Sequence, residues 1–495
     1  MSVSTLPSEL TQIPFLRAAS DPDGPCIQDG DRVLDNATFA QAVRRLADRF
    51  ASLGVSSGDT VAVLLHNRVE IVTTMFAAWL RGAAMSPVNP ALTDEEIHYQ
   101  VQDSTSAVIV GDEHAGDVAE AVGVAWVDVQ TIHEPTQTPV SIREPASVAS
   151  DFALVIYTSG TTGKPKGVLL DHANLAAMST SIIAHFSLTG ADTSLLVLPL
   201  FHVNGLVASV LSVLRAGGNV VVGPRFSPDT FWDVVETHRP TYFSAVPTIY
   251  AILDARTHRT VDTSSLRFVI CGAAPMPGDL ITRFEERFQV PVIEGYGLSE
   301  GTVVSTINPV DGPRKPGTVG VALPGQEVAI VSVDGEPQPR GQRGEVVIRG
   351  ANVMRGYLGR PEETAKVVRD GWLHTGDVGI IDEDGFLRIV DRLKDMIIRG
   401  GENIYPKEIE ECLYGHPAVL EAAVVGKPDD VFGEVPVAFV ATKPGLAVAS
   451  ADLLAHCSAA LARYKVPTQI HVRTELPKNS VGKLVKGLLR DQTAQ

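Results

Sequence analysis

Residues 157–167 read Tyr-Thr-Ser-Gly-Thr-Thr-Gly-Lys-Pro-Lys-Gly, directly after the apolar run 152–156. The run predicts a buried strand, and the glycines predict a loop whose backbone can approach a ligand because no Cβ atom is in the way. Hydroxyl donors and lysine ammonium groups in such a loop suit a polyphosphate. The candidate phosphate-binding residues are Thr158, Ser159, Gly160, Thr161, Thr162, Gly163 and Lys164.

The spacing within this loop excludes one common type of phosphate site. Two residues separate Gly160 from Gly163, and Pro165 follows Lys164. The P-loop of kinases and NTPases needs four residues between its glycines and a Lys-Ser or Lys-Thr pair at the start of a helix. A P-loop enzyme is therefore disfavoured.

Outward from the loop, helical and strand patterns alternate along the chain. Apolar residues at helical spacing are followed repeatedly by short apolar runs, which predicts layered α/β architecture with largely parallel sheets. The expected helices span 36–53, 70–81, 174–185, 231–237 and 279–288, and the expected strands span 60–65, 107–110, 194–198, 242–245 and 266–270.

The pattern changes in the last third of the chain. From about 317 to 390, short β-like runs at 327–331, 344–348 and 386–390 predict a β-rich subdomain. A compact α/β unit of about a hundred residues is expected after that. Its elements are predicted at 407–413, 422–425, 436–441, 451–461 and 468–472. The sequence therefore divides into domains at 1–391 and 396–495, joined by 392–395.

Composition limits the function. The chain has 495 residues, 44% hydrophobic and 20% charged, with a formal net charge of −17. Such an acidic balance argues against nucleic-acid binding, which requires clustered lysine and arginine. Cys26, Cys271, Cys412 and Cys457 are widely separated, which indicates a reducing compartment and no structural zinc. Without a leader or a membrane-spanning stretch, we expect a soluble cytoplasmic protein.

Seven stretches together resemble the adenylate-forming superfamily of acyl-CoA synthetases, luciferases and peptide-synthetase adenylation domains. They occur in family order and cover nearly the whole chain, and Gly-Gly-Glu-Asn-Ile-Tyr-Pro at 400–406 is similar to the acyl- and aryl-CoA ligase branch. The stretches are 157–167, 198–205, 272–275, 295–300, 372–377, 391–404 and 477–483.

The resemblance implies an acid–CoA ligase that uses ATP, Mg²⁺ and CoA. Glu300 matches the magnesium-binding glutamate of the family, and Ser299 replaces its usual threonine while keeping the hydroxyl group for the α-phosphate. Tyr296 would stack on adenine. The other implied adenine-site residues are Gly272, Ala273, Ala274, Glu294 and Gly295.

The same resemblance assigns residues to a mobile C-terminal lid. Asp377 and Arg392 would contact the ribose, and Lys483 would bridge the carboxylate and the α-phosphate during adenylation. Lys394 stands at the hinge position, where rotation would replace Lys483 at the active site by the hairpin that carries Gly401. Gly401 would leave room for pantetheine, and Lys465 would meet a CoA phosphate, with an ordinary exposed lysine as the alternative.

The acyl pocket is expected to be apolar. By resemblance its wall residues are His202, Val203, Val207, Val246, Gly297 and Val303. His202 would also gate the pantetheine tunnel as part of the catalytic machinery, with a structural histidine as the alternative. No lysine or arginine among them would meet a second carboxylate, which favours a fatty, aryl or polycyclic monocarboxylic acid. Stretches 198–205 and 243–249 also look like those of oxalate- and malonate-activating relatives.

Three functions remain open at this point. The acceptor could be CoA, as Gly401 favours, or a carrier protein, and a catalytically silent adenylate sensor is the third reading. Lys483 and Glu300 are both present, which disfavours the sensor. The sequence leaves a monomer and a homodimer open.

Overall fold

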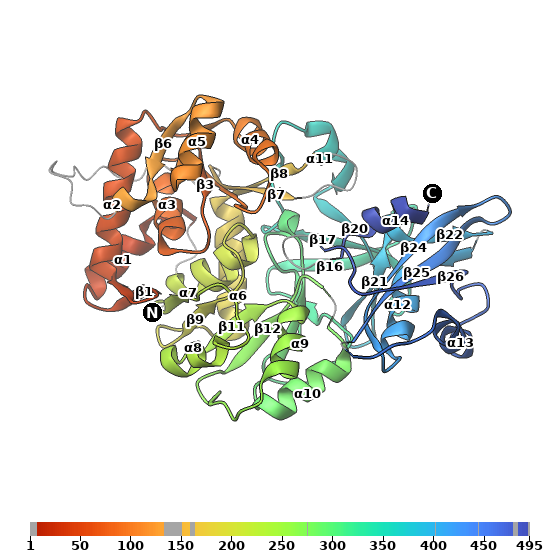
Figure 1. The fold of residues 1–495 in the computed structure, drawn as a ribbon. Helices are drawn as coiled ribbons and strands as arrows, with labels where there is room; N and C mark the ends of the chain where they lie inside the picture. The colour runs from red at the N-terminus through yellow and green to blue at the C-terminus, as the bar shows by residue number, and fades with distance from the viewer. Residues whose placement is uncertain are drawn as a thin grey trace. The chain divides into compact units, whose positions relative to one another are not determined.

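The computed structural model describes residues 7–132, 151–158, 164–274, 276–400, 402–443, 445–478 and 484–493. They form two compact units, one from the described residues up to 328 with 348–373 and one from 329–347 with 374 onward. The expected α/β architecture is confirmed (Figure 1). Of the β-rich region, residues 329–347 and 374–390 group with the C-terminal part, whereas 348–373 group with the first unit. The division into domains 1–391 and 396–495 with a hinge at 392–395 stays a prediction.

The first unit contains a seven-stranded sheet in the order β18-β8-β7-β4-β3-β5-β6. Its five central strands run parallel. They are β3 (Thr60–Leu64), β4 (Ala84–Val88), β5 (Ser106–Gly111), β6 (Ala125–Asp128) and β7 (Phe152–Thr158). At the edge, β8 (Lys166–Asp171) and β18 (Gly356–Tyr357) are antiparallel. The phosphate loop therefore connects two paired strands, β7 and β8.

A nine-stranded sheet in the order β15-β14-β13-β12-β11-β9-β10-β1-β2 belongs to the same unit. The parallel strands are β1 (Pro25–Asp29), β9 (Thr193–Leu196), β10 (Asn219–Val222), β11 (Tyr242–Ala245), β12 (Phe268–Cys271) and β13 (Val292–Tyr296). Short antiparallel strands complete the edges: β2 (Arg32–Asp35), β14 (Thr306–Ile307) and β15 (Val321–Ala322).

Two strand predictions were wrong at one end. The strand expected at 194–198 ends at Leu196, because the chain then leaves the sheet and the Leu198 carbonyl accepts a hydrogen bond from Asn67 Nδ2 at 2.9 Å. The strand expected at 266–270 begins at Phe268, since Leu266 still closes a turn with Thr263. Apolar composition alone does not locate these ends.

Helices and sheets of this unit form alternating layers. Helices α3 (Val69–Leu80) and α6 (His172–Phe186) pack into the large core shared by the two sheets, which explains why every residue from 69 to 79 is buried. Helices α4 (Asp94–Asp103) and α5 (Glu113–Val122) cover the other face of the seven-stranded sheet. The outer face of the nine-stranded sheet is covered by α8 (Phe231–His238), α9 (Pro247–Arg256) and α10 (Gly278–Phe288) (Figure 1).

The remaining helical elements of the unit are short or peripheral. They are η1 (Pro7–Gln12), α1 (Ile13–Ser20), α2 (Asn36–Ser52), η2 (Val129–Thr131), η3 (Asn204–Leu211), α7 (Ser212–Arg215), η4 (Ser299–Gly301) and α11 (Pro361–Val367). Of these, η3 has the i to i+5 pattern of a π-helix.

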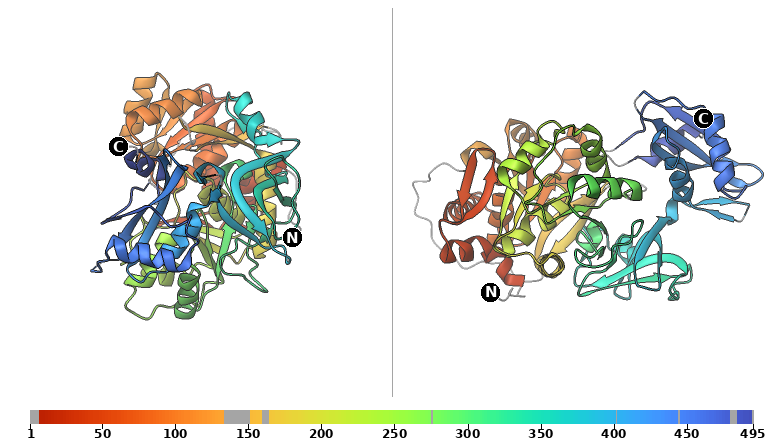
Figure 2. Two further views of the ribbon diagram at one scale, coloured as in Figure 1. Left: turned by 90° about the vertical axis from the view of Figure 1, so that its right-hand side faces the viewer. Right: turned by 90° about the horizontal axis from the view of Figure 1, so that it is seen from below.

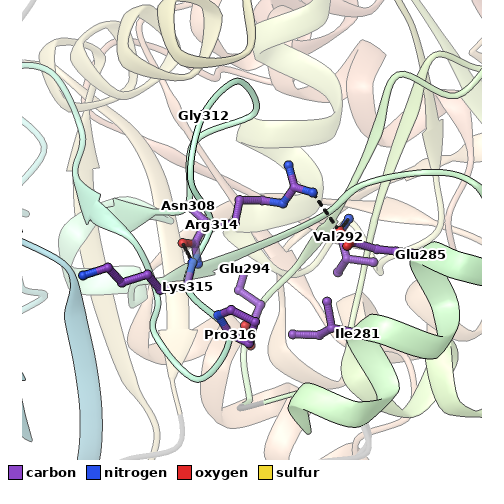
Figure 3. Close-up of a pocket in the computed structure, with 9 residues that line it drawn as sticks. All are labelled: Ile281, Glu285, Val292, Glu294, Asn308, Gly312, Arg314, Lys315 and Pro316. Atoms are coloured by element: carbon purple, nitrogen blue, oxygen red, sulfur yellow. Dashed lines mark hydrogen bonds and ion pairs between the residues drawn. The ribbon is translucent and has the colours of Figure 1, made fainter.

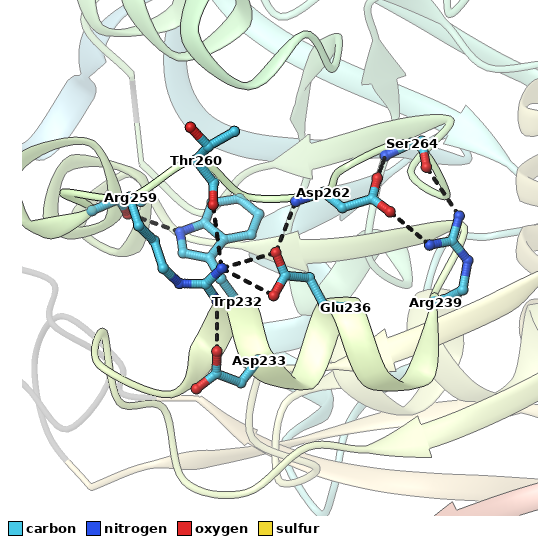
Figure 4. A network of polar contacts seen from close by, with 9 residues as sticks. Trp232, Asp233, Glu236, Arg239, Arg259, Thr260, Asp262 and Ser264 are labelled. Atoms are coloured by element: carbon cyan, nitrogen blue, oxygen red, sulfur yellow. Dashed lines mark hydrogen bonds and ion pairs between the residues drawn. The ribbon is translucent and has the colours of Figure 1, made fainter.

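Ion pairs attach the connection between α9 and β12 to α8 (Figure 4). Arg259 contacts Asp233 at 2.5 Å and Glu236 at 2.9 Å, and Arg239 contacts Asp262 at 2.9 Å. These side chains are largely exposed, so water screens each pair and its contribution to stability is small. They position a surface connection on the face of the sheet opposite the large core.

A five-stranded sheet has the order β16-β17-β20-β19, with β21 also paired to β20. The strands are β16 (Gln326–Val331), β17 (Arg343–Gly350), β19 (Val368–Arg369), β20 (Trp372–Ile381) and β21 (Leu387–Arg392). They confirm the expected β-rich region. The register of β20 and β21 places Asp377 directly opposite Arg392.

The C-terminal part of the second unit is built on the long hairpin of β24 (Val419–Asp429) and β25 (Gly433–Thr442), blue in Figure 2. One face of this sheet packs on α12 (Pro406–Tyr414) and α13 (Ser450–Ala460), and the other face packs on α14 (Lys486–Thr493). The other elements are η5 (Leu393–Asp395), β22 (Ile397–Arg399), β23 (Glu402–Ile404) and β26 (Gln469–Arg473). The compact unit expected there is confirmed.

Candidate active site

The chain connections mark a ligand-binding edge on the nine-stranded sheet. After β9 the chain passes through η3 and α7 on the side of the large core, whereas after β10 it passes through α8 on the opposite face and enters β11. The connections therefore diverge between β9 and β11. A crevice outside the carboxyl ends of parallel strands at such a point is the usual ligand site of open α/β sheets.

The predicted acyl and adenine residues follow these carboxyl ends. His202 and Val203 come after β9, Val246 follows β11, and Gly272 follows β12. Tyr296 ends β13, and Gly297 comes next. The structure thus brings residues far apart in sequence to one edge of one sheet, which chain order alone does not require.

His202 lies just before the π-helix η3, whose N-cap is Val203. Burial lowers the pKa of His202 to about 4, so its ring is neutral at physiological pH. Its Nε2 atom is buried without a hydrogen-bond partner among the described residues. A neutral ring with an unpaired nitrogen can accept or donate one hydrogen bond, but it supplies no positive charge.

The backbone approaches itself closely where β13 leads into the Glu300 turn. A Cβ atom on Gly297 would lie 2.1 Å from the Val303 carbonyl oxygen, so only glycine fits. Val303 has a φ of 94°, which a β-branched residue rarely adopts. Strain of this kind is concentrated at functional sites, in agreement with both residues being predicted pocket walls.

Glu300 lies in the turn η4, and its side chain has a partner from a distant segment. The Tyr357 hydroxyl donates to Glu300 Oε1 at 2.9 Å. Burial, together with Glu300, raises the pKa of Tyr357, so the phenol stays protonated. The turn itself is fixed by Asn352, whose Nδ2 donates to the Gly301 carbonyl at 2.9 Å and whose carbonyl accepts from Thr302 Oγ1 at 2.6 Å.

Residues 159–163 of the phosphate loop lie outside the described residues, but both of its ends are anchored. The Tyr157 hydroxyl donates to Asp103 Oδ2 at 2.9 Å, and the Tyr99 hydroxyl donates to the Pro165 carbonyl at 2.9 Å. Arg360 Nη2 contacts both Tyr99 and Asp103, at 2.8 and 3.2 Å. Lys164 lies 4.8 Å from the centre of the Tyr99 ring. Sequence reasoning missed these anchors.

One of the predicted adenine residues, Glu294, lines a polar pocket of about 160 Å³ (Figure 3). Glu294 is 7% exposed, and its Oε1 accepts from the Met276 amide at 3.4 Å. Across the pocket, Arg314 contacts Glu285 at 3.2 Å. Ala273 has a φ of 68°, which turns the chain just after β12. The other lining residues are Ile281, Val292, Asn308, Gly312, Lys315 and Pro316.

The second unit holds the predicted ribose and hinge residues. Asp377 is 5% exposed and accepts from Arg392 Nε at 2.9 Å. Burial, followed by the charge of Arg392, lowers the pKa of Lys394. Arg392 therefore contacts the carboxylate assigned to the ribose, and its positive charge acts on the nearby predicted hinge lysine. The structure brings these three predicted residues together.

The predicted CoA residues are only partly described. Lys465 Nζ forms an ion pair with Glu408, at 2.6 and 2.8 Å to its two carboxylate oxygens. Arg399, at the base of the hairpin, lies 4.9 Å from the Phe432 ring and donates to the Tyr464 carbonyl at 2.6 Å. Gly401 and Lys483 lie outside the described residues, so their roles stay predictions.

Comparison with known proteins identifies the two parts of the chain. Residues 15–358 match the family model described as AMP-binding enzyme, and residues 408–483 match the AMP-binding enzyme C-terminal domain. The chain is 38% identical over 486 residues to a feruloyl-CoA synthase from Amycolatopsis sp, with 96% of this chain and 97% of the relative covered. It is 37% identical to an oxalate–CoA ligase from Arabidopsis thaliana, with 92% and 93% covered.

A solved structure agrees with this result. O-succinylbenzoate coenzyme A synthetase from Bacillus subtilis, in complex with ATP and a magnesium ion, superposes with a TM-score of 0.88. The two chains are 34% identical, and the alignment covers 97% of this chain and 98% of the other. The relatives thus share the architecture along the whole chain while their named acids differ.

Proposed function

Because this chain belongs to the AMP-binding enzyme family, in its acyl-CoA synthetase branch, we propose that it activates an apolar monocarboxylic acid with ATP and transfers the acyl group to CoA. The reaction has two steps. A carboxylate oxygen attacks the α-phosphorus of ATP and pyrophosphate leaves, and the CoA thiol then attacks the acyl-adenylate carbonyl while AMP leaves. ATP, Mg²⁺ and CoA are the cosubstrates and cofactor of this ligase branch.

Glu300 fits the role of magnesium ligand. Its Oε1 accepts from Tyr357, which leaves Oε2 as a hard oxygen donor for the ion. The described residues contain no cluster of three or more His, Cys, Asp or Glu side chains that could bind a metal. A single protein carboxylate suits Mg²⁺, which keeps waters and binds substrate phosphates, and when bound it would neutralise phosphoryl charge.

The other residues position the two substrates in this proposal. The loop 158–164 surrounds the phosphates and the Ser299 hydroxyl meets the α-phosphate. Tyr296 with Gly272–Ala274, Glu294 and Gly295 holds the adenine, while Asp377 and Arg392 hold the ribose. Lys483 offsets charge at the α-phosphate during adenylation only, because rotation at Lys394 replaces it by Gly401 for thioester formation.

The acid is inferred from the predicted wall residues at the carboxyl ends of β9 and β11. Val203 and Val207 are 6% and 0% exposed, and His202 is held neutral by burial. A second carboxylate at such walls would lose its hydration without meeting a cation, which costs several kcal/mol, on the order of 2–7 even for a neutral polar group. The burial of the apolar residues Val203 and Val207 is the observation that carries the proposal of an apolar acid, and the named acid of the feruloyl-CoA synthase relative is compatible with it.

A substrate panel tests this proposal. Pyrophosphate release would be measured with aryl acids, medium- and long-chain fatty acids, oxalate and malonate, each with and without CoA. We expect turnover with at least one apolar monocarboxylic acid and none with oxalate or malonate. Turnover with the dicarboxylic acids alone would establish the second candidate, which the oxalate–CoA ligase relative supports. Adenylation of an apolar acid without transfer to CoA would instead point to a carrier protein.

We also propose that the enzyme works in the cytoplasm. Its four cysteines are free, and Cys26, Cys271 and Cys457 are buried, as expected in a reducing compartment. In the described part of the chain, no helix is both long and apolar enough to cross a bilayer. A homodimer remains a proposal that light scattering of the purified protein would decide.

A further inference from the structure

Tyr357 connects two parts of the proposed ATP site that lie far apart in sequence. Its hydroxyl donates to Glu300 Oε1 at 2.9 Å, and its ring centre lies 5.1 Å from the Lys166 ammonium at the end of the phosphate loop. Lys166 also pairs with Glu363. The same phenol thus contacts the carboxylate assigned to magnesium and the last lysine of the loop assigned to the phosphates.

The backbone on either side of Tyr357 is fixed, so its hydroxyl cannot easily move away. Strand β18 pairs Tyr357 with Val168 of β8, and the Leu358 amide donates to the Gly167 carbonyl at 2.8 Å. The Tyr357 amide donates to Thr364 Oγ1 at 2.9 Å, and the Met354 amide donates to the Glu300 carbonyl at 2.8 Å. The segment 354–358 therefore holds both β8 and the Glu300 turn.

We propose that Tyr357 is a positioning residue that aims the Glu300 carboxylate at the magnesium ion of MgATP. With Oε1 engaged by the phenol, the carboxylate is restricted to one rotamer and Oε2 is presented for the metal. The contact between Lys166 and the ring holds the end of β8 that follows the phosphate loop next to this tyrosine. This inference rests on the proposed function, because it takes Glu300 as the magnesium ligand.

Tyr357→Phe is the informative variant, because it keeps the ring that packs under Lys166 and removes only the hydroxyl group. Metal affinity would be measured directly by electron paramagnetic resonance of free Mn²⁺, titrated into enzyme with α,β-methylene ATP, which cannot release pyrophosphate. Removal of a hydrogen bond to a charged group should weaken Mn²⁺ binding about tenfold. In assays, half-saturation by Mg²⁺ should rise by the same factor, and the rate of adenylation should recover at high Mg²⁺.

Tyr250→Phe is the matched control. Its hydroxyl is buried and donates to the Ile270 carbonyl at 2.6 Å, and not to Glu300 or to the phosphate loop. Loss of that bond should lower stability but leave Mn²⁺ binding unchanged. If both variants lost the same stability and neither changed Mn²⁺ affinity, Tyr357 would be structural only and the proposal would be overturned.

Glu300→Gln separates failure of this inference from failure of the proposed function. We expect Glu300→Gln to weaken Mn²⁺ binding strongly, and the double variant with Tyr357→Phe to be no weaker than Glu300→Gln alone, because the tyrosine acts through the carboxylate. Additive losses would contradict the positioning role. Unchanged Mn²⁺ binding in Glu300→Gln would instead show that the metal assignment is wrong.

Discussion

The close contact between Gly297 and Val303 shows how individual residues shape the wall of the proposed pocket. The strained φ of Val303 and the close approach of its carbonyl oxygen to Gly297 occur together. Gly272, at the neighbouring strand end, differs, since a Cβ atom there would be 3.6 Å from the Gly295 carbonyl oxygen and in ordinary contact. The two glycines are therefore expected to be required for different reasons.

Gly297→Ala should lower the free energy of unfolding by about 2 kcal/mol, because the backbone must shift to relieve the overlap. Gly272→Ala should leave the melting temperature unchanged and raise KM for ATP about tenfold, because its methyl group enters the space assigned to adenine. Thermal melts and the ATP dependence of pyrophosphate exchange would measure both effects. Equal melting temperatures for the two variants would contradict the packing argument.

Lys483→Ala should abolish adenylation and leave thioester formation from supplied acyl-adenylate largely intact. Only the first step places new negative charge on the α-phosphate, where the lysine would act. The two half-reactions would be assayed separately with the same purified variant. Equal losses in both would remove the role assigned to Lys483.

At the scale of helices and strands, the two ends of the phosphate loop are held by β7, β8 and the elements next to them. Asp103, at the end of α4, accepts from Tyr157 on β7 and from Arg360 just before α11. The loop ends are therefore anchored to a helix and to a segment nearly two hundred residues further along the chain. We infer that this arrangement fixes the positions of the two ends of the loop.

Asp103→Asn should raise KM for ATP about tenfold, because a neutral amide makes weaker bonds to Tyr157 and Arg360 and the loop is held less firmly. Transfer from preformed acyl-adenylate to CoA should keep its rate, since no triphosphate is bound in that step. Steady-state kinetics of pyrophosphate release and single-turnover transfer would test this. A loss confined to the second step would show that Asp103 acts elsewhere.

The elements that the sequence predicted well are those with a strong apolar period. Helix α10, expected at 279–288, begins one residue earlier, and β11 was predicted at its observed bounds. The π-helix η3 was missed, because its apolar residues are compatible with several helical periods. The end of the strand expected at 194–198 was misplaced because Leu198 is apolar, although its carbonyl accepts a hydrogen bond from Asn67 and not from a neighbouring strand.

The candidate site shows the same division. Roles for Glu300, Asp377 and Arg392 were predicted from their motifs and stay predictions, and the structure places the last two in contact. Tyr357 could not, because Gly-Tyr in isolation predicts nothing and its partner is 57 residues away. Asp103 and Arg360 were missed for the same reason, since sequence spacing does not reveal a hydrogen bond between distant segments.

The fold as a whole buries histidines that the proposed reaction does not need as charged groups. His172, in the core between the two large sheets, is 1% exposed, and its ring packs against Trp79 at 5.1 Å with both nitrogens lacking partners among the described residues. Burial lowers the pKa of His172 to about 4, partly offset by Asp151 and Asp171, and burial also lowers the pKa of His185. The first unit therefore folds around neutral imidazole rings.

Acid should destabilise the enzyme between pH 6.5 and about pH 4. In this range the unfolded chain binds protons at His172 and His202 that the folded protein excludes, so stability is complete above pH 6.5 and falls as pH approaches the folded pKa of about 4. A shift of this size corresponds to about 3 kcal/mol for a fully buried histidine.

His172→Phe keeps an aromatic ring beside Trp79 and removes the titration. Its melting temperature should therefore fall less than that of the wild type between pH 7.5 and 5, with pH 8 as the reference at which the imidazoles are neutral. Parallel curves for the two proteins would show that His172 does not control the acid response.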